Sequence, residues 1–367
     1  MLIYLCLSSH GYGHAARQAA VLTELHRLYP DLRLVVSTDV DQRFLNLVFR
    51  AVPFEHRRLR WDVGMVQTHA FGIDSSATLK ALHELEISNP AQISAEAAWI
   101  RSQQIPAMIL ADIPPAAAEL ADQAGVPLLW MGNFGWDEIY HPLGDYFLAH
   151  AEAAATEYAR GHQLLRCPFS LKMDWGVPEQ SIGITAAKPR PLPIALQEKL
   201  ASCNAPIVMV GFGGMGFALK PDLFRRWPDH LFLVPQPRSA NTSLADQQPE
   251  NVIYLPESSL VLDALPFCAR HLGKPGYSSF CEAISLGVGL HVFEREGFAE
   301  SKALIDGLQR YAAHRLLERH ALELGEWELD QQIVSPTQQS LASNGALVAA
   351  QAVLEFAVRS AILISKL

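Results

Sequence analysis

Lys274-Pro-Gly-Tyr-Ser-Ser-Phe-Cys-Glu282 combines a cation, a glycine, two hydroxyls and a carboxylate on a turn that leads into a helix. Gly276 allows the backbone to approach a ligand closely, and Ser278 and Ser279 lie where helix N-terminal amides and hydroxyls can bind phosphate oxygens. Lys274 adds positive charge, and Glu282 can accept hydrogen bonds from ribose hydroxyls. The segment therefore suits a nucleoside diphosphate, although an ordinary serine-capped helix after a Lys-Pro-Gly turn explains it equally well.

Short apolar runs alternate with longer helical patterns along the chain, which predicts parallel sheets joined by helical crossovers. The runs cover residues 3–7, 32–36, 108–110, 127–131, 207–210, 231–234, 252–255 and 290–293. An apolar strand followed by a glycine-rich turn occurs at residues 8–14 and again at 211–216. Two such openings predict an α/β protein with two doubly wound halves of the Rossmann type.

The connector between the two halves is expected at residues 186–193, where closely spaced prolines disfavour a helix. We expect an N-terminal domain over residues 1–187 and a C-terminal domain over 188–343. The last helix, residues 344–367, is expected to return and pack on the N-terminal domain. It is apolar but interrupted by Glu355 and Arg359, which favours packing over a membrane anchor and leaves at most a peripheral membrane contact.

Composition narrows the classes of partner and compartment. The 367 residues carry a net charge of −9 and no long run of Lys and Arg, which argues against a nucleic-acid partner. The five cysteines are scattered without any C-x-x-C spacing, which predicts reduced thiols in the cytoplasm and no structural zinc site. The first residues form an apolar run without a basic region before it, which is typical of a core strand rather than a signal peptide.

The turn after the first strand places Gly11, Gly13, His14 and Arg17 at the carboxyl edge of a sheet, where open α/β sheets bind ligands. A histidine there can act as a general base near neutral pH. Arg17, one helical turn further on, can meet an anion. A plain turn made by the two glycines, with His14 capping the helix, explains this segment equally well.

A second carboxyl edge follows in the same half. Asp112 ends an apolar strand and can orient the imidazole of His14 by fixing its tautomer, although capping of the next helix explains it equally well. Asn133, Trp136 and Asp137 follow the next strand and can shape a sugar or acceptor pocket, or equally pack against the interdomain helix.

Other motifs are weaker. Gly213 and Gly214 lie in a glycine-rich turn that resembles a phosphate loop but lacks the lysine and hydroxyl of a Walker A sequence, so it gives little support for ATP or NAD. Asp39-Val-Asp41 matches a D-x-D pattern, yet no third ligand is evident and we interpret it as loop acid. No G-x-S-x-G elbow supports serine hydrolysis.

Three motifs together resemble the GT-B superfamily of glycosyltransferases: residues 11–17 (GYGHAAR), 133–140 (NFGWDEIY) and 274–282 (KPGYSSFCE). The sequence resembles in particular the glycosyltransferase-like N-terminal domain of plant arabinokinases. It is more distantly similar to plant UDP-sugar transferases and to the N-acetylglucosaminyl transferase of peptidoglycan synthesis. The motifs follow the family order and span nearly the whole chain, so the resemblance implies a GT-B fold, with two facing Rossmann-like domains and an interdomain cleft.

The resemblance also assigns roles. It implies that His14 is the base, that Asp112 is its partner and that Glu282 binds the ribose. Ser278 and Ser279 take the places of an Asn-Ser pair that holds pyrophosphate, and Lys274 stands where plant enzymes have histidine. Further donor contacts are implied for a separate set: Gly213, Gly214, Tyr254, Leu255, Glu296 and Glu300, with Arg295 near the donor sugar. The familiar Gly-Val-Pro and acidic-Gln patterns are replaced here by residues 287–289 and 295–300, which leaves the donor sugar open.

The function implied by the resemblance is transfer of a sugar from a nucleoside diphosphate, with UDP favoured, to an acceptor hydroxyl. Inversion at the anomeric carbon is expected, with no metal and no cofactor besides the nucleotide sugar. The alternatives are a nucleotide-sugar hydrolase or epimerase on the same fold, and a non-catalytic nucleotide-sugar-binding protein. The acceptor and the oligomeric state are not identified by the sequence.

Overall fold

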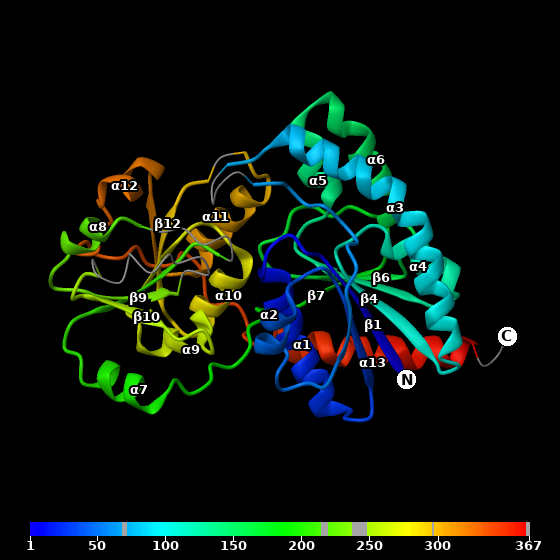
Figure 1. Ribbon diagram of the computed structural model, residues 1–367, viewed down its shortest axis with the longest axis horizontal. Coiled ribbons are helices and arrows are strands. Elements are labelled where there is room, and N and C mark those ends of the chain that lie inside the picture. The colour runs from blue at the N-terminus through cyan, green and yellow to red at the C-terminus, as the bar shows by residue number, and fades with distance from the viewer. Residues whose placement is uncertain (68–71, 214–218, 237–247, 296, 365–367) are drawn as a thin grey trace.

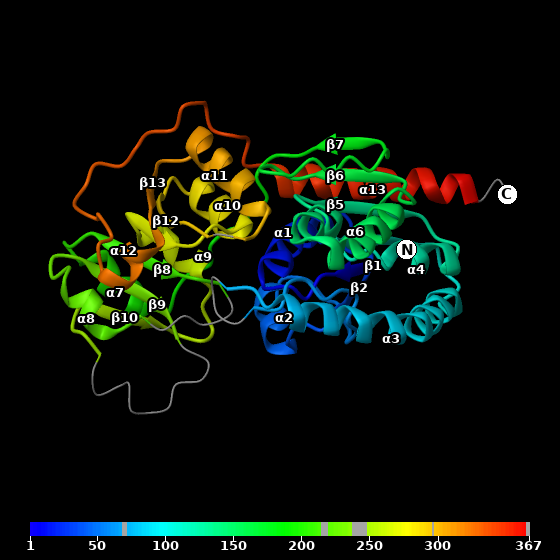
Figure 2. The same ribbon diagram turned by 90° about the horizontal axis from the view of Figure 1, so that it is seen from above.

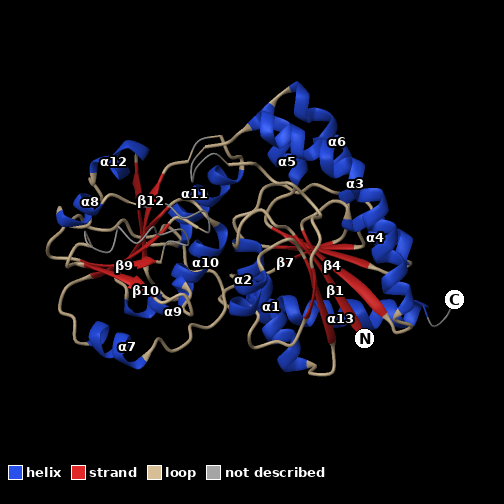
Figure 3. Cartoon of the chain, in the orientation of Figure 1, coloured by secondary structure: helices blue, strands red, loops and turns tan. Residues whose placement is uncertain are grey.

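The computed structural model describes residues 1–67, 72–213, 219–236, 248–295 and 297–364. Within these residues the chain forms two parallel β-sheets, each flanked by helices, that lie side by side along the long axis of the molecule (Figure 1). Figure 3 shows the same arrangement by secondary structure, with the strands of each sheet enclosed by helices. The expected α/β architecture of two doubly wound halves is confirmed.

The first sheet has the strand order β3-β2-β1-β4-β5-β6-β7, and all its neighbouring strands are parallel. Its strands are β1 (Leu2–Leu7), β2 (Arg33–Ser37), β3 (Glu55–Arg57), β4 (Ala107–Asp112), β5 (Leu128–Gly132), β6 (Gln163–Arg166) and β7 (Glu179–Ser181). Its helices are α1 (Gly13–Leu28), α2 (Gln42–Val48), α3 (Ser75–Ser102), α4 (Ala117–Ala124), α5 (Trp136–Tyr140), the 3-10 turn η1 (His141–Leu143) and α6 (Asp145–Tyr158).

The second sheet has the strand order β10-β9-β8-β11-β12-β13, again all parallel. Its strands are β8 (Ile207–Gly211), β9 (Leu231–Pro235), β10 (Val252–Leu255), β11 (Arg270–Gly273), β12 (Gly289–Phe293) and β13 (His314–Leu317). Its helices are α7 (Ile194–Ala201), α8 (Pro221–Arg225), α9 (Val261–Ala264), the 3-10 turn η3 (Leu265–Phe267), α10 (Tyr277–Ser285), α11 (Glu300–Tyr311) and α12 (Arg319–Leu324).

The central strands are apolar on both faces because helices cover both sides of each sheet. In β1, Ile3 and Leu5 join the core beneath α1, whereas Leu2 and Tyr4 join the core beneath α3 and α4. The period of two along a strand produces this division, since successive side chains point to opposite faces. The strand order reverses at β1 and β4 in the first sheet and at β8 and β11 in the second, and ligands of open α/β sheets bind at such points.

Two segments join the domains. The expected boundary at residues 187 and 188 lies in the segment between β7 and α7, and it stays a prediction. In that segment Arg190 pairs with Asp263 of α9 at 2.6 Å and donates to the carbonyl of Leu47 at 3.0 Å. Helix α13 (Gly345–Ile364) lies along α1 of the first domain (Figure 2). Among the described residues, no helix has the length and apolar character needed to cross a bilayer.

Candidate active site between the domains

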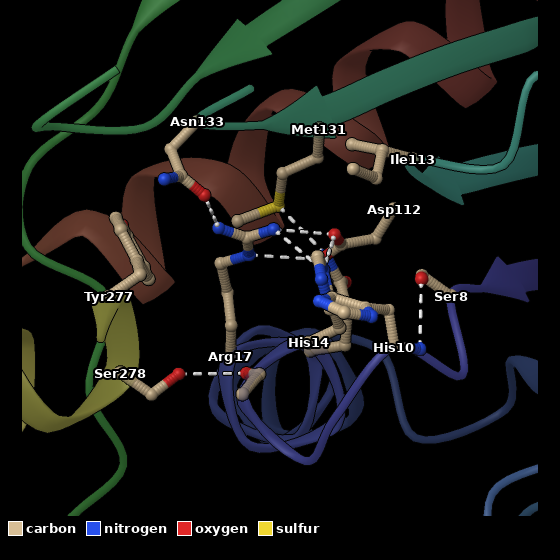
Figure 4. Close-up of polar contacts among 12 residues, drawn as sticks. Ser8, His10, His14, Arg17, Asp112, Ile113, Met131, Asn133, Tyr277 and Ser278 are labelled. Carbon is tan, nitrogen blue, oxygen red and sulfur yellow. Dashed lines mark hydrogen bonds and ion pairs between the residues drawn. The ribbon is translucent and has the colours of Figure 1, made fainter. Parts of the chain in front are cut away.

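A histidine and an aspartate meet at the switch point of the first sheet. His14 lies in the first turn of α1, directly after β1, and Asp112 ends the neighbouring strand β4, opposite Leu7. The Nδ1 atom of His14 lies 2.8 Å from Oδ1 of Asp112 (Figure 4). Among the described residues, none forms a hydrogen bond with Nε2 of His14. The pair therefore has the geometry in which a carboxylate holds one ring nitrogen and leaves the other for chemistry.

Asp112 is fully buried and accepts more hydrogen bonds than the one from His14. Arg17 donates to both carboxylate oxygens, with Nε 2.9 Å from Oδ2, and Gln18 donates to Oδ2 at 2.6 Å. Although burial disfavours the charge, the Arg17 guanidinium and His14 hold the pKa of Asp112 below its ordinary value. Asp112 is consequently a fixed negative charge that His14 shares with a permanent cation.

Arg17 is buried and has several partners within the protein. Besides Asp112, its Nη1 donates to Oδ1 of Asn133 at 2.7 Å, and its guanidinium lies 4.7 Å from the ring centre of Tyr277 in the second domain. Its Nη2 lies 3.2 Å from Nδ1 of His14. The anion that Arg17 meets in this structure is the carboxylate of Asp112. We call His14, Arg17, Gln18, Asp112 and Asn133 the imidazole cluster.

The turn after β5 contributes one residue to the domain interface and two to the interior. Asn133 donates from Nδ2 to Oε1 of Glu300 in the second domain at 2.8 Å. Trp136 is fully buried, and its Nε1 donates to Oδ2 of Asp62 at 2.8 Å. Asp137 accepts from Nε1 of Trp175 at 3.1 Å. Trp136 and Asp137 thus make these contacts within the first domain.

The turn after β11 faces the imidazole cluster from the second domain. Helix α10 follows Gly276, and no side-chain hydrogen bond caps its N-terminus. Ser278 donates from Oγ to the carbonyl of Gly13 at 2.8 Å. A Cβ at Gly13 would lie 3.3 Å from that Oγ, so a glycine there allows the two domains to touch. Among the described residues, the Ser279 hydroxyl has no hydrogen-bond partner. We call residues 274–282 the α10 turn.

The charged groups of the α10 turn have displaced pKa values. Burial, together with the nearby charge of Arg295, lowers the pKa of Lys274 to about 8. Burial, together with Asp263, raises the pKa of Glu282 to about 8. Both shifts disfavour the charged form, as expected for ionisable groups that are removed from water. Among the described residues, no hydrogen bond or ion pair to the Glu282 carboxylate is found.

The remaining predicted donor residues lie at varied distances from this turn. A Cβ at Gly213, after β8, would lie 3.7 Å from Cε of Lys274, so these two turns meet at the switch point. Tyr254 and Leu255 end the edge strand β10, with Leu255 buried. Burial raises the pKa of Glu300, which faces Asn133. Gly214 and Glu296 lie outside the described residues, and Gly11 has the positive φ of 87° expected at a glycine turn.

Several residues of the interface were not predicted. Gln18 lies four positions after His14, so it shares a face of α1 with His14 and bonds the same carboxylate. This helical spacing is a signal that could have identified Gln18. Tyr277 was quoted only as part of its motif, yet its hydroxyl lies 2.9 Å from Oγ1 of Thr185. His10 lies between Trp136 and Phe298, with ring centres 5.2 and 5.8 Å away, and no sequence spacing indicated this.

The acidic pair of the D-x-D pattern has structural partners. Asp39 pairs with Arg58 at 2.8 Å, and Asp41 caps α2 by accepting from the amide of Arg43 at 2.9 Å. Within the part of the chain that the structure describes, no group of three or more His, Cys, Asp or Glu side chains is arranged to hold a metal ion.

Comparison with known proteins gives one curated relative and many similar structures. L-arabinokinase of Arabidopsis thaliana is 26% identical over 333 residues, which cover 88% of this chain and 31% of the relative. The chain thus spans about a third of the length of that relative. No protein-family model matches the sequence.

The similar structures share the fold at low sequence identity. UGT2 of Phytolacca americana, complexed with UDP-2-fluoro-glucose and pterostilbene, has a TM-score of 0.60 and 14% identity and covers 96% of this chain and 89% of its own. UGT89C1 of Arabidopsis thaliana, complexed with UDP-L-rhamnose, has a TM-score of 0.60 and 13% identity, covering 97% and 94%. The calicheamicin glycosyltransferase CalG4 has a TM-score of 0.60 and 13% identity, covering 100% and 97%.

The predicted resemblance to arabinokinases and to GT-B glycosyltransferases is confirmed, and the chain has the GT-B fold.

Proposed function

We propose that this chain transfers a glycosyl group from a nucleoside diphosphate sugar, with UDP favoured, to an acceptor hydroxyl. The observation that carries the proposal is the meeting of two switch points. The His14–Asp112 pair ends one sheet, the N-terminus of α10 begins beside the other, and the Ser278–Gly13 hydrogen bond of 2.8 Å joins them. The ligands named for the similar structures, UDP-2-fluoro-glucose and UDP-L-rhamnose, support the choice of donor class.

The α10 turn supplies the donor side. Free amides at the N-terminus of a helix bind phosphate oxygens, and Lys274 adds a positive charge beside them. A hydroxyl has one proton to donate, and Ser278 gives its proton to Gly13, so Ser279 is the better phosphate ligand in this arrangement. Glu282 would accept hydrogen bonds from the ribose hydroxyls. Gly213 and Gly214 would border the diphosphate, Tyr254 and Leu255 the base, and Glu296 and Glu300 the donor sugar.

His14 supplies the base. With Nδ1–H donating to Asp112, the lone pair of Nε2 takes the proton of the acceptor hydroxyl, whose oxygen forms the new bond to the anomeric carbon. The bond to the diphosphate breaks on the opposite face, so configuration inverts. Lys274 and the α10 amides stabilise the departing charge without a metal. Preorganised donors of this kind each supply about 3 kcal/mol of transition-state stabilisation.

Arg17 holds the partner of the base. Its Nη2 lies 3.2 Å from Nδ1 of His14. Because Arg17 also holds both oxygens of Asp112, it fixes the carboxylate in the position that orients the imidazole. We assign Arg17 as a positioning residue rather than a ligand of the substrate.

Hydrolysis of a nucleotide sugar is a second candidate. It is favoured by the small exposed part of the His14 side chain, 8%, because water needs less room than a sugar or an aromatic acceptor. The same base would then activate water, and free sugar and UDP would accumulate.

The test is product analysis of UDP-sugars incubated with and without candidate acceptors. We expect a new glycoside only when the acceptor is present, whereas free sugar formed equally in both conditions would assign hydrolysis. A His14→Ala variant should retain UDP binding and lose about 100- to 10,000-fold in kcat. His26→Ala, at the other end of α1, is the control and should keep wild-type turnover. Binding of UDP-sugars without turnover by the wild type would leave a non-catalytic binding protein and refute the proposal.

A further inference from the structure

Arg295 is a buried cation with unused hydrogen-bond donors. It follows β12, and its relative exposure is 9%. Among the described residues, neither Nε nor Nη2 of its guanidinium has a hydrogen-bond partner, and both atoms are buried. The ring of Phe298 lies 4.3 Å from the guanidinium carbon, which covers one face of the cation but leaves the in-plane N–H groups unpaired.

Leaving a guanidinium in this condition is costly. A buried donor without a partner loses its hydration, and the loss is larger for a charged group. Burial accordingly lowers the pKa of Arg295, and the charge of Glu300 offsets only part of that effect. Glu300 also accepts a hydrogen bond at 2.8 Å from Asn133 of the other domain. Within the described part of the chain, two donors of Arg295 therefore lack partners and its charge is only partly offset by a carboxylate.

A second cation, Lys274, lies near Arg295. Arg295 follows β12 and Lys274 follows β11, and these strands are neighbours in the second sheet. The charge of Arg295 contributes to the lowered pKa of Lys274 and of His10, and His10 is also affected by Lys274. Glu300 is the carboxylate whose charge acts on both cations. Of the residues that the structure describes, two cations and one carboxylate thus gather beside the N-terminus of α10.

We propose that Arg295 and Lys274 together form a binding site for an oxyanion carried by the donor. This inference rests on the proposed function, because the donor is taken to be a nucleotide sugar. The oxyanion is a phosphate of the diphosphate bridge, or a carboxylate on the sugar, since both present the paired oxygens that a guanidinium fork binds. In the first case Arg295 stabilises the leaving group, and in the second it selects acidic sugars.

The test uses calorimetric titration of the whole chain with five probes: uridine, UDP, UDP-glucose, UDP-glucuronate and inorganic pyrophosphate. The variants are Arg295→Met and Arg295→Lys. Arg315→Gln is the matched control, because Arg315 is an arginine of the same domain that pairs with Glu328. We expect Arg295→Met to bind UDP and pyrophosphate about 10- to 100-fold more weakly than the wild type, with uridine unchanged. Arg295→Lys should recover part of this affinity.

The ligand-free proteins provide a second readout. Replacing an unpaired buried cation by an apolar side chain of similar length is neutral or stabilising, so Arg295→Met should melt at or above the wild-type temperature. A purely structural arginine would give the opposite shift. A loss confined to UDP-glucuronate would identify the sugar carboxylate as the oxyanion.

The two proposals can fail separately. If the wild type binds UDP and Arg295→Met binds each of the five probes as tightly as the wild type does, the oxyanion site is refuted while the proposed function stands. If the wild type binds pyrophosphate through Arg295 but no nucleotide, the oxyanion site stands and the proposed function is refuted.

Discussion

The two sheets reverse their strand order in the same way, yet the polar groups at the two switch points differ in how they are satisfied. At the first switch point, Asp112 is hydrogen-bonded to His14, Arg17 and Gln18. Arg17 also donates a hydrogen bond to Asn133. At the second, the N-terminus of α10 lacks a side-chain cap and Arg295 keeps unused donors among the described residues. The charged groups of the first switch point pair with one another, and the second has the features of a site that a ligand completes.

The difference indicates how the two halves divide the work. A base must be held in one geometry before the substrate arrives, so its hydrogen bonds are supplied by the protein. A donor site can leave donors such as those of Arg295 and the α10 amides for the ligand, because the ligand repays that cost when it binds. Burial lowers the pKa of Lys274 and raises the pKa of Glu282 at the same site.

The largest expected effect comes from breaking the ion pair between Asp112 and Arg17 at the first switch point. Asp112→Asn removes the charge that balances Arg17 in a fully buried position, so the free energy of unfolding should fall by about 3–5 kcal/mol. Because the folded-state pKa of Asp112 is lowered, this stabilisation is present above the ordinary carboxylate pKa and is lost as the pH falls below it. Denaturant unfolding at pH 7 and at pH 3 measures both effects.

Asp39→Asn is the control for this prediction, since the Asp39–Arg58 pair is exposed and should contribute 1 kcal/mol or less. An Asp112→Asn protein that unfolds within about 1 kcal/mol of the wild type would contradict the view that the first switch point is held together by its ion pair.

The next effect tests the second switch point, at the α10 turn, through Lys274. A bound diphosphate favours the protonated amine, and Lys274 is protonated below its pKa of about 8. The contribution of Lys274 to UDP affinity should therefore be constant below its pKa, then fall up to about tenfold per pH unit above it. Lys274→Met should bind UDP about 100-fold more weakly and without this decline. Calorimetric titrations from pH 7 to 10 give the profile, and parallel profiles for both proteins would remove Lys274 from the site.

The sequence predicted the two switch points better than the contacts between them. Apolar runs and glycine turns were sufficient for the fold, because strand ends and helix starts depend on local pattern. The same reasoning put His14 and Asp112 at neighbouring strand ends, where they lie 2.8 Å apart. Side-chain partners between residues distant in sequence have no such pattern. The pairing of Arg17 with Asp112, 95 positions away, depends on how α1 and β4 pack.

The same limit explains the residues whose roles the sequence left open. The turn after β5 fitted either a pocket or packing, and only the three-dimensional surroundings of Trp136 distinguish these. Ser278 and Ser279 are equivalent in the motif, yet a carbonyl 265 positions away takes the proton of one of them. Arg295 was noted as a departure from the family pattern, but its unpaired donors are a property of the folded chain.

A smaller effect separates these two serines. Ser279→Ala should weaken UDP binding about tenfold, the value of about 1.4 kcal/mol expected for a hydrogen bond to a charged group. Ser278→Ala should leave UDP affinity within about twofold of wild type, because its proton is given to Gly13. Titrations of both variants with UDP make the comparison. An equal loss in the two variants would mean that the contact between Ser278 and Gly13 opens when the nucleotide binds.

The smallest effect is the number of protons, at most about one, that UDP binding releases. Glu282 has a pKa of about 8, so at pH 7 its carboxyl is mainly protonated before UDP binds. Hydrogen bonds from ribose hydroxyls favour the ionised form, so UDP binding at pH 7 should release up to about one proton. Calorimetry in two buffers of different ionisation enthalpy measures this number.

The comparison sharpens when the pH is raised, because the two groups of the α10 turn then act in opposite directions. At pH 9 Glu282 is already largely ionised, whereas Lys274 must take up a proton, so UDP binding should change from proton release to proton uptake. Glu282→Gln should abolish the release at pH 7 and keep the uptake at pH 9. Glu323→Gln, an exposed carboxylate of the same domain, should change neither. If Glu282→Gln releases as many protons as the wild type, Glu282 does not contact the ribose, and its raised pKa reflects burial beside Asp263 alone.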